Sequence, residues 1–134
     1  MKTLLVSLIL TSALAVPARA QDWAMDGFDA VVLLEQGRPV PGRGDIATLW
    51  KDQIWHFATE ENRSRFEADP RSFAPALGGL CPVALSEGRR VQGDPRHFLV
   101  IGGRLYLMGS ARARQELRGN PQAILEQAQA NWNG

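Results

Sequence analysis

Cys81 is the residue with the most direct chemical potential, because it is the only cysteine among the 134 residues. It follows Gly78-Gly79 and precedes a short predicted helix, Pro82 to Glu87. The free N–H groups and the dipole at a helix N-terminus favour the thiolate, which is the form that binds soft metals and reacts. Cysteine is also among the most buried residue types, and Leu80 and Val83 flank this one. Two roles therefore stay open for Cys81: a reactive or metal-binding thiol, or a small buried hydrophobe.

The two histidines are the other candidate ligands. His56 lies between two aromatic residues on a predicted strand. Two interpretations stay open: the ring faces a cleft and acts as a ligand or base, or it is a half-exposed sheet residue that makes one hydrogen bond. His97 follows Arg96 and is expected to face solvent at the start of a strand. Thiolate, imidazole and a thioether such as that of Met108 suit a copper-type ion, and zinc takes the first two. Cys81 and His56 are thus the hypothetical metal ligands, although no C-x-x-C or H-x-x-x-H spacing brings them together.

Three functions follow from these residues. The first is a small binding module that is not catalytic and that binds a soft metal through Cys81. The second is a thiol-based redox or peroxide-responsive protein that uses Cys81. The third is a structural or protein-interaction domain with no metal, because four tryptophans are many for a small chain and tryptophan is frequent at binding hot spots. In this third view Trp23 and Trp132 either bind a partner or hold the chain ends onto the domain.

No enzyme is predicted, and the candidate catalytic set is empty. A cysteine nucleophile needs a base within hydrogen-bond reach, and no local motif places a histidine beside Cys81. The only adjacent carboxylates of interest, Glu60-Glu61, suit the first turn of a helix.

The elements that position these residues are predicted from periodicity, caps and turn residues. We expect a buried strand over Phe28–Leu34, a helix over Glu60–Ala68 with Thr59 as N-cap, and a helix over Pro82–Glu87. Two hairpins are expected, the second joined by a two-glycine turn; they are Ile46–Trp50 with Gln53–Phe57, and Phe98–Ile101 with Arg104–Met108. Helices should follow over Ala111–Arg118 and from Asn120-Pro121 to about Trp132. The expected fold is α+β, antiparallel β-hairpins with short packed helices, and no internal repeat is expected.

Residues 1–20 have the features of a secretory signal peptide. Lys2 is followed by an apolar run, Leu4 to Val16, and by the small-residue exit Ala18-Arg19-Ala20. The predicted product is a single domain, residues 21–134, in the periplasm or secreted, with no membrane association after cleavage. Of the 15 basic and 14 acidic residues, the signal removes Lys2 and Arg19, which leaves a net charge of −1. This balance argues against a nucleic-acid partner, and one cysteine allows no internal disulfide in an oxidising compartment.

A series of short motifs runs through nearly the whole predicted mature chain: Gly27-Phe28-Asp29, Trp55-His56-Phe57-Ala58-Thr59, Glu61-Asn62-Arg63, Phe66, Asp69-Pro70, Phe73-Ala74-Pro75, Gly78-Gly79-Leu80-Cys81, Gly93-Asp94-Pro95, Gly103-Arg104-Leu105-Tyr106-Leu107 and Asn131-Trp132. In their order and spacing these motifs resemble the YHS-domain family, in its exported single-domain subgroup.

The resemblance implies a small α+β domain, found alone in periplasmic proteins and as a module in metal-handling proteins. The metal-associated members carry cysteines where this chain has Ala58 and Asn62, so their metal association does not transfer. Exported members usually have tyrosine where this chain has Leu80, while their cysteine is kept as Cys81. The two missing cysteines favour a hidden role for Cys81.

Overall fold

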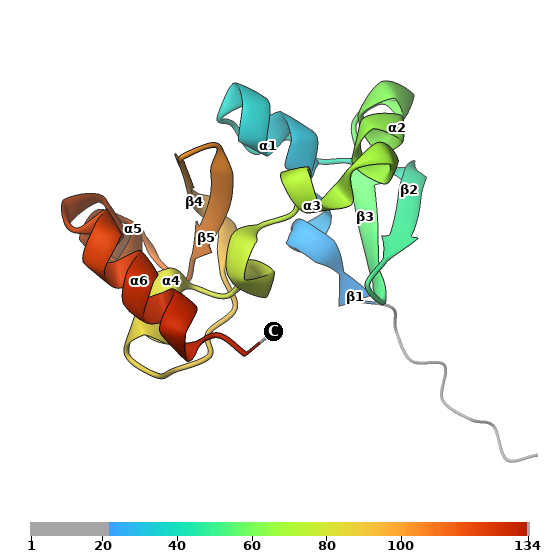
Figure 1. The fold of residues 1–134 in the computed structure, drawn as a ribbon. Coiled ribbons are helices and arrows are strands. Elements are labelled where there is room, and N and C mark those ends of the chain that lie inside the picture. The colour runs from blue at the N-terminus through green and yellow to red at the C-terminus, as the bar shows by residue number, and fades with distance from the viewer. Residues whose placement is uncertain (1–21, 134) are drawn as a thin grey trace, which may run out of the picture.

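The computed structural model describes residues 22–133 (Figure 1). The predicted signal peptide, residues 1–20, lies outside the described residues. Helices dominate, and the strands form two small sheets, so the α+β fold is confirmed.

The described chain consists of two successive halves with similar element order. The first half contains β1 (Asp22–Trp23), the 3₁₀ helix η1 (Ala24–Gly27), α1 (Ala30–Gln36), β2 (Arg43–Trp50), β3 (Gln53–Phe57), α2 (Glu60–Ala68) and α3 (Pro70–Phe73). The second half contains the 3₁₀ helix η2 (Ala76–Gly79), α4 (Pro82–Ser86), β4 (Asp94–Ile101), β5 (Arg104–Met108), α5 (Ala111–Gly119) and α6 (Pro121–Asn131).

Each half is built around one antiparallel hairpin. In the first, Trp50 pairs with Gln53 across a two-residue turn, and β1 adds to the other edge of β3 in parallel. In the second, Ile101 pairs with Arg104 across Gly102-Gly103. The central residues of both turns have positive φ, between 48° and 72°, as two-residue hairpin turns require. Both predicted hairpins are confirmed, and their turns point in opposite directions (Figure 1).

The expectation that the chain contains no repeat is wrong. Thr59 and Ser110 stand 51 positions apart and cap α2 and α5 through the same side-chain bond to the N–H three residues on. The loops after η1 and η2 carry matching backbone bonds: Gly42 N donates to Gly27 O at 2.8 Å, and Gly93 N donates to Gly79 O at 2.9 Å. The two halves keep backbone geometry and burial rather than residue identity, which is why the repeat is hard to see in the sequence.

A second correction concerns the apolar run after Phe28, which forms helix α1 and not the expected buried strand. Asp29 caps this helix by accepting hydrogen bonds from Val31 N and Val32 N, and Gly37 ends it with φ 65°. A short apolar run buried on several sides has the same sequence pattern in a strand and in a helix. The cap residue and the glycine were the signals that distinguish them.

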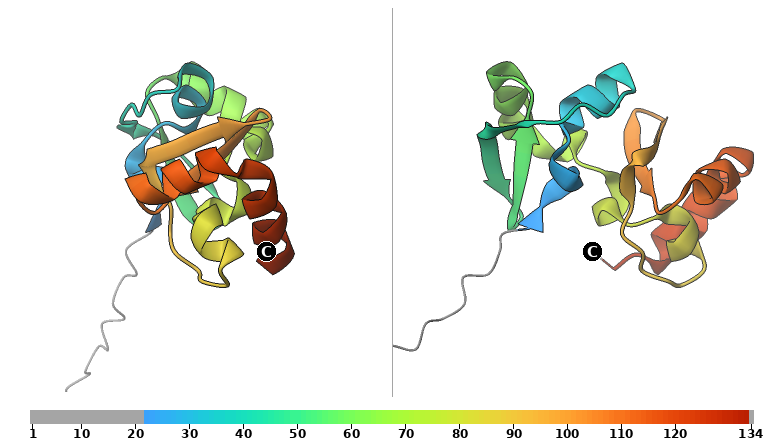
Figure 2. Two further views of the ribbon diagram at one scale, coloured as in Figure 1. Left: turned by 90° about the vertical axis from the view of Figure 1, so that its left-hand side faces the viewer. Right: turned by 180° about the vertical axis from the view of Figure 1, so that it is seen from behind.

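The hairpin β4–β5 lies between the two halves of the core (Figure 2). Leu105 and Leu107 pack with the first half, against a cluster that includes Trp55, Phe57 and Phe66. Met108 packs with the second half, and Tyr106 borders that same cluster. Alternate residues of one strand thus serve two cores, as the period of two in a strand allows, and this shared strand joins the halves into one unit.

Within residues 22–133, none of the helices has both the length and the apolar character that a membrane crossing requires.

Candidate functional site

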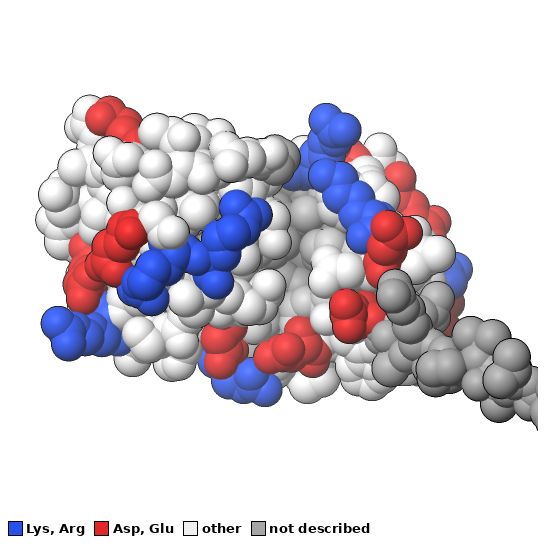
Figure 3. Space-filling model, turned by 90° about the horizontal axis from the view of Figure 1, so that it is seen from below, with Lys and Arg blue, Asp and Glu red and all other residues white. Residues whose placement is uncertain are grey.

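A cleft of about 940 Å³ lies at the junction of the two halves. The view from below shows the molecule hollowed between its two lobes (Figure 3). Equivalent positions of the two halves line it as pairs: Trp23 with Pro75, Met25 with Leu77, Asp26 with Gly78, Gln53 with Arg104, and Trp55 with Tyr106. Clefts of several hundred Å³ between structural units are the usual location of small-molecule sites. The cleft is therefore a product of the repeat, since neither half encloses it alone.

Aromatic side chains form much of the cleft wall. Trp23 is 60% exposed, which is unusual for the largest apolar side chain. Two neighbours fix Trp50 in place. The Trp55 indole N–H donates to the Trp50 carbonyl oxygen at 3.0 Å, and the Trp50 ring packs edge-on against Phe66. Trp132 reaches the cleft from the end of α6 and packs on the small cluster around Leu77. These flat faces suit a planar or apolar ligand.

Three cationic side chains also line the cleft: Lys51 in the first hairpin turn, Arg71 in α3 and Arg104 at the start of β5. The Arg104 guanidinium donates through Nη1 to the carbonyl oxygen of Arg71 at 3.3 Å. This bond joins the side chain of Arg104, from the second half, to the backbone of Arg71, from the first half, and both residues line the cleft.

The base of the cleft contains strained backbone at equivalent places. Met25 and Leu77 have φ of 58° and 57°, in the left-handed region that non-glycine residues rarely adopt. Both belong to the 3₁₀ helices η1 and η2, and both are buried. Strained non-glycine residues are enriched at functional sites, because the surrounding structure must hold them in place. No local pattern of residues predicts these two turns.

Asp29 is a buried carboxylate, which is a common feature of functional sites, but its contacts show that it stabilises the fold. It is fully buried, and its carboxylate accepts four hydrogen bonds, from Val31 N, Val32 N, Ala58 N and the Asn62 side-chain amide. These distances run from 2.8 to 3.1 Å. The carboxylate thus ties α1 to the end of β3 and the start of α2. An aspartate directly before an apolar run is an N-cap signal, and this is the pattern that marks Asp29 in the sequence.

Cys81 occupies the position in the second half that Asp29 occupies in the first. Both precede the short helix of their half, and their backbone N–H groups donate to Val91 O and Val40 O at 2.8 and 2.9 Å. Cys81 is 2% exposed and packs with Val83, Met108 and Leu117, with no side-chain cap bond. The structure therefore favours the buried, hydrophobic role of Cys81.

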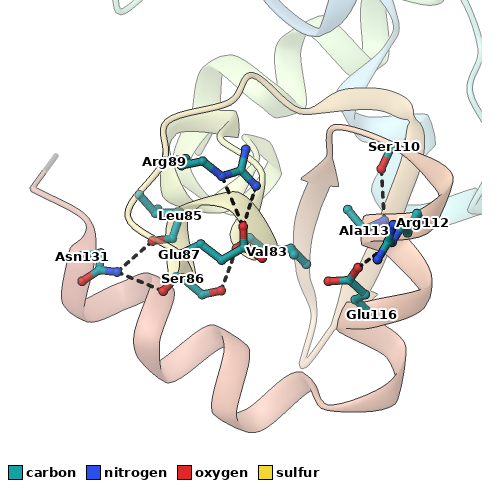
Figure 4. Close-up of polar contacts among 10 residues, drawn as sticks. All are labelled: Val83, Leu85, Ser86, Glu87, Arg89, Ser110, Arg112, Ala113, Glu116 and Asn131. Atoms are coloured by element: carbon teal, nitrogen blue, oxygen red, sulfur yellow. Dashed lines mark hydrogen bonds and ion pairs between the residues drawn. The ribbon is translucent and has the colours of Figure 1, made fainter.

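A shallow depression of about 460 Å³ has Cys81 in its lining. Its rim carries two ion pairs, Arg89–Glu87 at 2.6 Å and Arg112–Glu116 at 3.1 Å (Figure 4). The Glu87 carboxylate raises the pKa of the Arg89 guanidinium through that hydrogen bond. The charges of the rim are thus already neutralised by one another.

His56 lies in the first half, on β3, and is 5% exposed rather than half-exposed. The ring of Trp23 covers it at a centroid distance of 4.5 Å, and its Nδ1 has no hydrogen-bond partner among residues 22–133. His97 is half-buried within β4, where we had expected a solvent-facing residue.

The proposed metal ligands are not gathered into one site. Cys81 and Met108 share the core of the second half, whereas His56 lies under Trp23 in the first half. Across the described part of the chain, no three His, Cys, Asp or Glu side chains are placed to hold one ion. The donor set of Cys81 with His56 therefore does not fit a copper or zinc centre.

Asn131 fixes the C-terminal end of the chain. Its side-chain amide donates to Leu85 O at 2.8 Å and to Ser86 O at 3.3 Å (Figure 4). These bonds attach α6 to the end of α4 and place Trp132 beside the cleft. Of the two terminal tryptophans, Trp132 thus sits on a fixed chain end, while Trp23 presents an exposed face.

Comparison with models of protein families, with curated proteins and with solved structures found no match to this chain.

Proposed function

We propose that this protein is an exported, YHS-like binding module that holds a small organic molecule in the cleft between its two halves and does not catalyse a reaction. The observation that carries the proposal is the cleft itself: about 940 Å³, lined by residues of both halves, with exposed aromatic faces beside cationic side chains. A cavity of this size accommodates a drug-sized ligand.

Binding is favoured over catalysis by where the reactive groups lie. The one thiol, Cys81, packs among aliphatic side chains and does not line the cleft. His56 is covered by Trp23. A nucleophile and its base need to be within hydrogen-bond reach of each other and of the substrate, and these two residues belong to different halves.

Cys81 has a packing role in this proposal. The soft-metal function depended on a second ligand, and His56 is not beside Cys81. The thiol-responsive function has one supporting observation, the depression that Cys81 helps to line. Alkylation kinetics, described in the Discussion, decide between a packing thiol and a responsive one.

Export to the periplasm or medium remains part of the proposal. It is tested by the N-terminal sequence of the protein recovered from those fractions, which should begin at Gln21. A recovered chain that still begins at Met1 would contradict cleavage.

The binding proposal is tested with two fluorescent probes that share one aromatic body, 8-anilinonaphthalene-1-sulfonate and the uncharged N-phenyl-1-naphthylamine. Saturable binding of at least one probe, with one site per chain, is expected. Gln129→Trp should weaken it by about tenfold, because Gln129 lines the cleft and a large side chain there fills part of the space.

Gln122→Trp is the matched control, since Gln122 lies on the same helix, is exposed, does not line the cleft and donates only to Glu126 on that helix. Circular dichroism establishes that both variants are folded. Equal probe affinity in the two variants, or no saturable binding of either probe, would overturn the proposal.

A further inference from the structure

The cationic side chains of the cleft are not neutralised by the protein. Within residues 22–133, no carboxylate lies within ion-pair distance of Lys51, Arg71 or Arg104, whereas six other arginines form ion pairs. Two aspartates also line the cleft. Asp26 pairs with Arg96 at 3.3 Å, and Arg96 also pairs with Asp94 at 3.1 Å. Of the two lining aspartates, Asp22 has no ion-pair partner within residues 22–133, so three cations share the lining with two carboxylates. The cleft therefore carries an excess of positive charge.

Arg104 and Arg71 are connected by a hydrogen bond from the side chain of one to the backbone of the other. The bond from Arg104 Nη1 to the Arg71 carbonyl oxygen brings β5 and α3 into contact and uses one guanidinium donor. A guanidinium has five N–H donors in a planar fork that matches the oxygens of carboxylate, phosphate or sulfonate groups. The remaining donors of Arg104, and those of exposed Arg71, are available to an anion in the cleft.

The aromatic residues of the same cleft suit a ligand that has an apolar part as well as an anionic group. Trp23 offers a face that is 60% exposed, and Tyr106 and Trp132 line the side contributed by the second half. Gly78 lies next to Trp132: a Cβ there would be in ordinary van der Waals contact, 3.8 Å from the indole nitrogen, and it is the φ of 62° that favours glycine. A flat ring system can lie against these side chains.

We propose that the ligand of this cleft is an organic anion, with a planar apolar body against Trp23, Tyr106 and Trp132 and an acidic group that Arg71 and Arg104 bind. This inference rests on the proposed binding function and adds the ligand class. Carboxylate, phosphate and sulfonate groups each present two oxygens that the fork of a guanidinium group can bind together, so arginine recognises the oxygen pair rather than the central atom.

The two anilinonaphthalene probes separate ligand class from binding itself, since they differ by one sulfonate. The sulfonate probe should bind the native protein about tenfold more tightly than the uncharged probe, the value expected for one charge-assisted contact. The double variant Arg71→Gln/Arg104→Gln should lose this preference and keep its affinity for the uncharged probe. Arg118→Gln is the control, because Arg118 is exposed, lies outside the cleft and forms no ion pair within residues 22–133.

Each result has one meaning. Equal affinity of the native protein for both probes, or an unchanged preference in the double variant, overturns the anion inference and leaves the binding function standing. A loss of preference in Arg118→Gln as large as in the double variant also overturns it, because general surface charge then explains the preference. Failure of both probes to bind overturns the proposed function together with the inference. Benzoate and phenyl phosphate, used as competitors of the sulfonate probe, show whether the cleft prefers a carboxylate or a phosphate group.

Discussion

Asp29→Ala tests the buried carboxylate that connects three elements of the first half. The substitution removes the acceptor for four donors, three of them backbone N–H groups. Loss of an N-cap costs about 1 kcal/mol, and a hydrogen bond to a charged group contributes about 1.5–3 kcal/mol. These terms are not additive within one network, so we expect a loss of about 3–5 kcal/mol in the free energy of unfolding. That is a large part of the ~5–15 kcal/mol typical of a domain.

Urea denaturation followed by circular dichroism measures this loss. Asp29→Asn should lie between the native protein and Asp29→Ala, because the amide keeps one acceptor for the helix cap but presents a donor toward Ala58 N and Asn62. Asp45→Ala is the control, since that carboxylate is exposed and pairs only with Arg43; a change under about 1 kcal/mol is expected. If Asp29→Ala were as stable as Asp45→Ala, the assigned role of the carboxylate would be wrong.

Three further predictions concern separate contacts. Cys81→Ala should lower the free energy of unfolding by only about 1–2 kcal/mol. The thiol of the folded protein should react with a thiol reagent at least a hundredfold more slowly than the thiol of the urea-unfolded chain, and comparable rates would favour a responsive thiol. Asn131→Ala should cost about 1–2 kcal/mol, because two carbonyls at the end of α4 lose their donor, whereas Asn133→Ala should change little in the same melt. The hydrogen bond from Arg65 holds the pKa of Glu35 below its usual value. The stabilisation of the folded state by this pair is therefore present above pH ~4.5 and is lost as the pH falls through the folded-state pKa. Glu35→Gln should therefore have a shallower loss of stability between pH 5 and 3 than the native protein, and parallel curves would contradict this pairing.

Local signals in the sequence predicted a large part of the fold. The Gly102-Gly103 turn between two β-rich runs and the cap residue Thr59 each act within a few positions, so one sequence is enough to recognise them. Helix α1 was missed because a short apolar run does not distinguish a buried strand from a buried helix. The left-handed turns at Met25 and Leu77 were missed because residues of these types rarely adopt positive φ.

The candidate site depended on contacts that a sequence does not show. Cys81 and His56 were chosen for the chemistry of their side chains, yet each is buried in its own half. The cleft residues come from segments far apart in the chain, and Arg71 and Arg104 meet only because the two halves pack together. The repeat that builds the cleft keeps caps, turns and buried positions while the residue types change, so identity gave little sign of it.

The central claim, that a small ligand binds between the two halves, is tested most directly by NMR chemical-shift mapping with 8-anilinonaphthalene-1-sulfonate. The account predicts saturable changes at backbone amides of η1, η2 and the start of β5, and at the indole N–H groups of Trp23 and Trp132. Changes confined to the depression beside Cys81, or scattered over the surface without saturation, would contradict it.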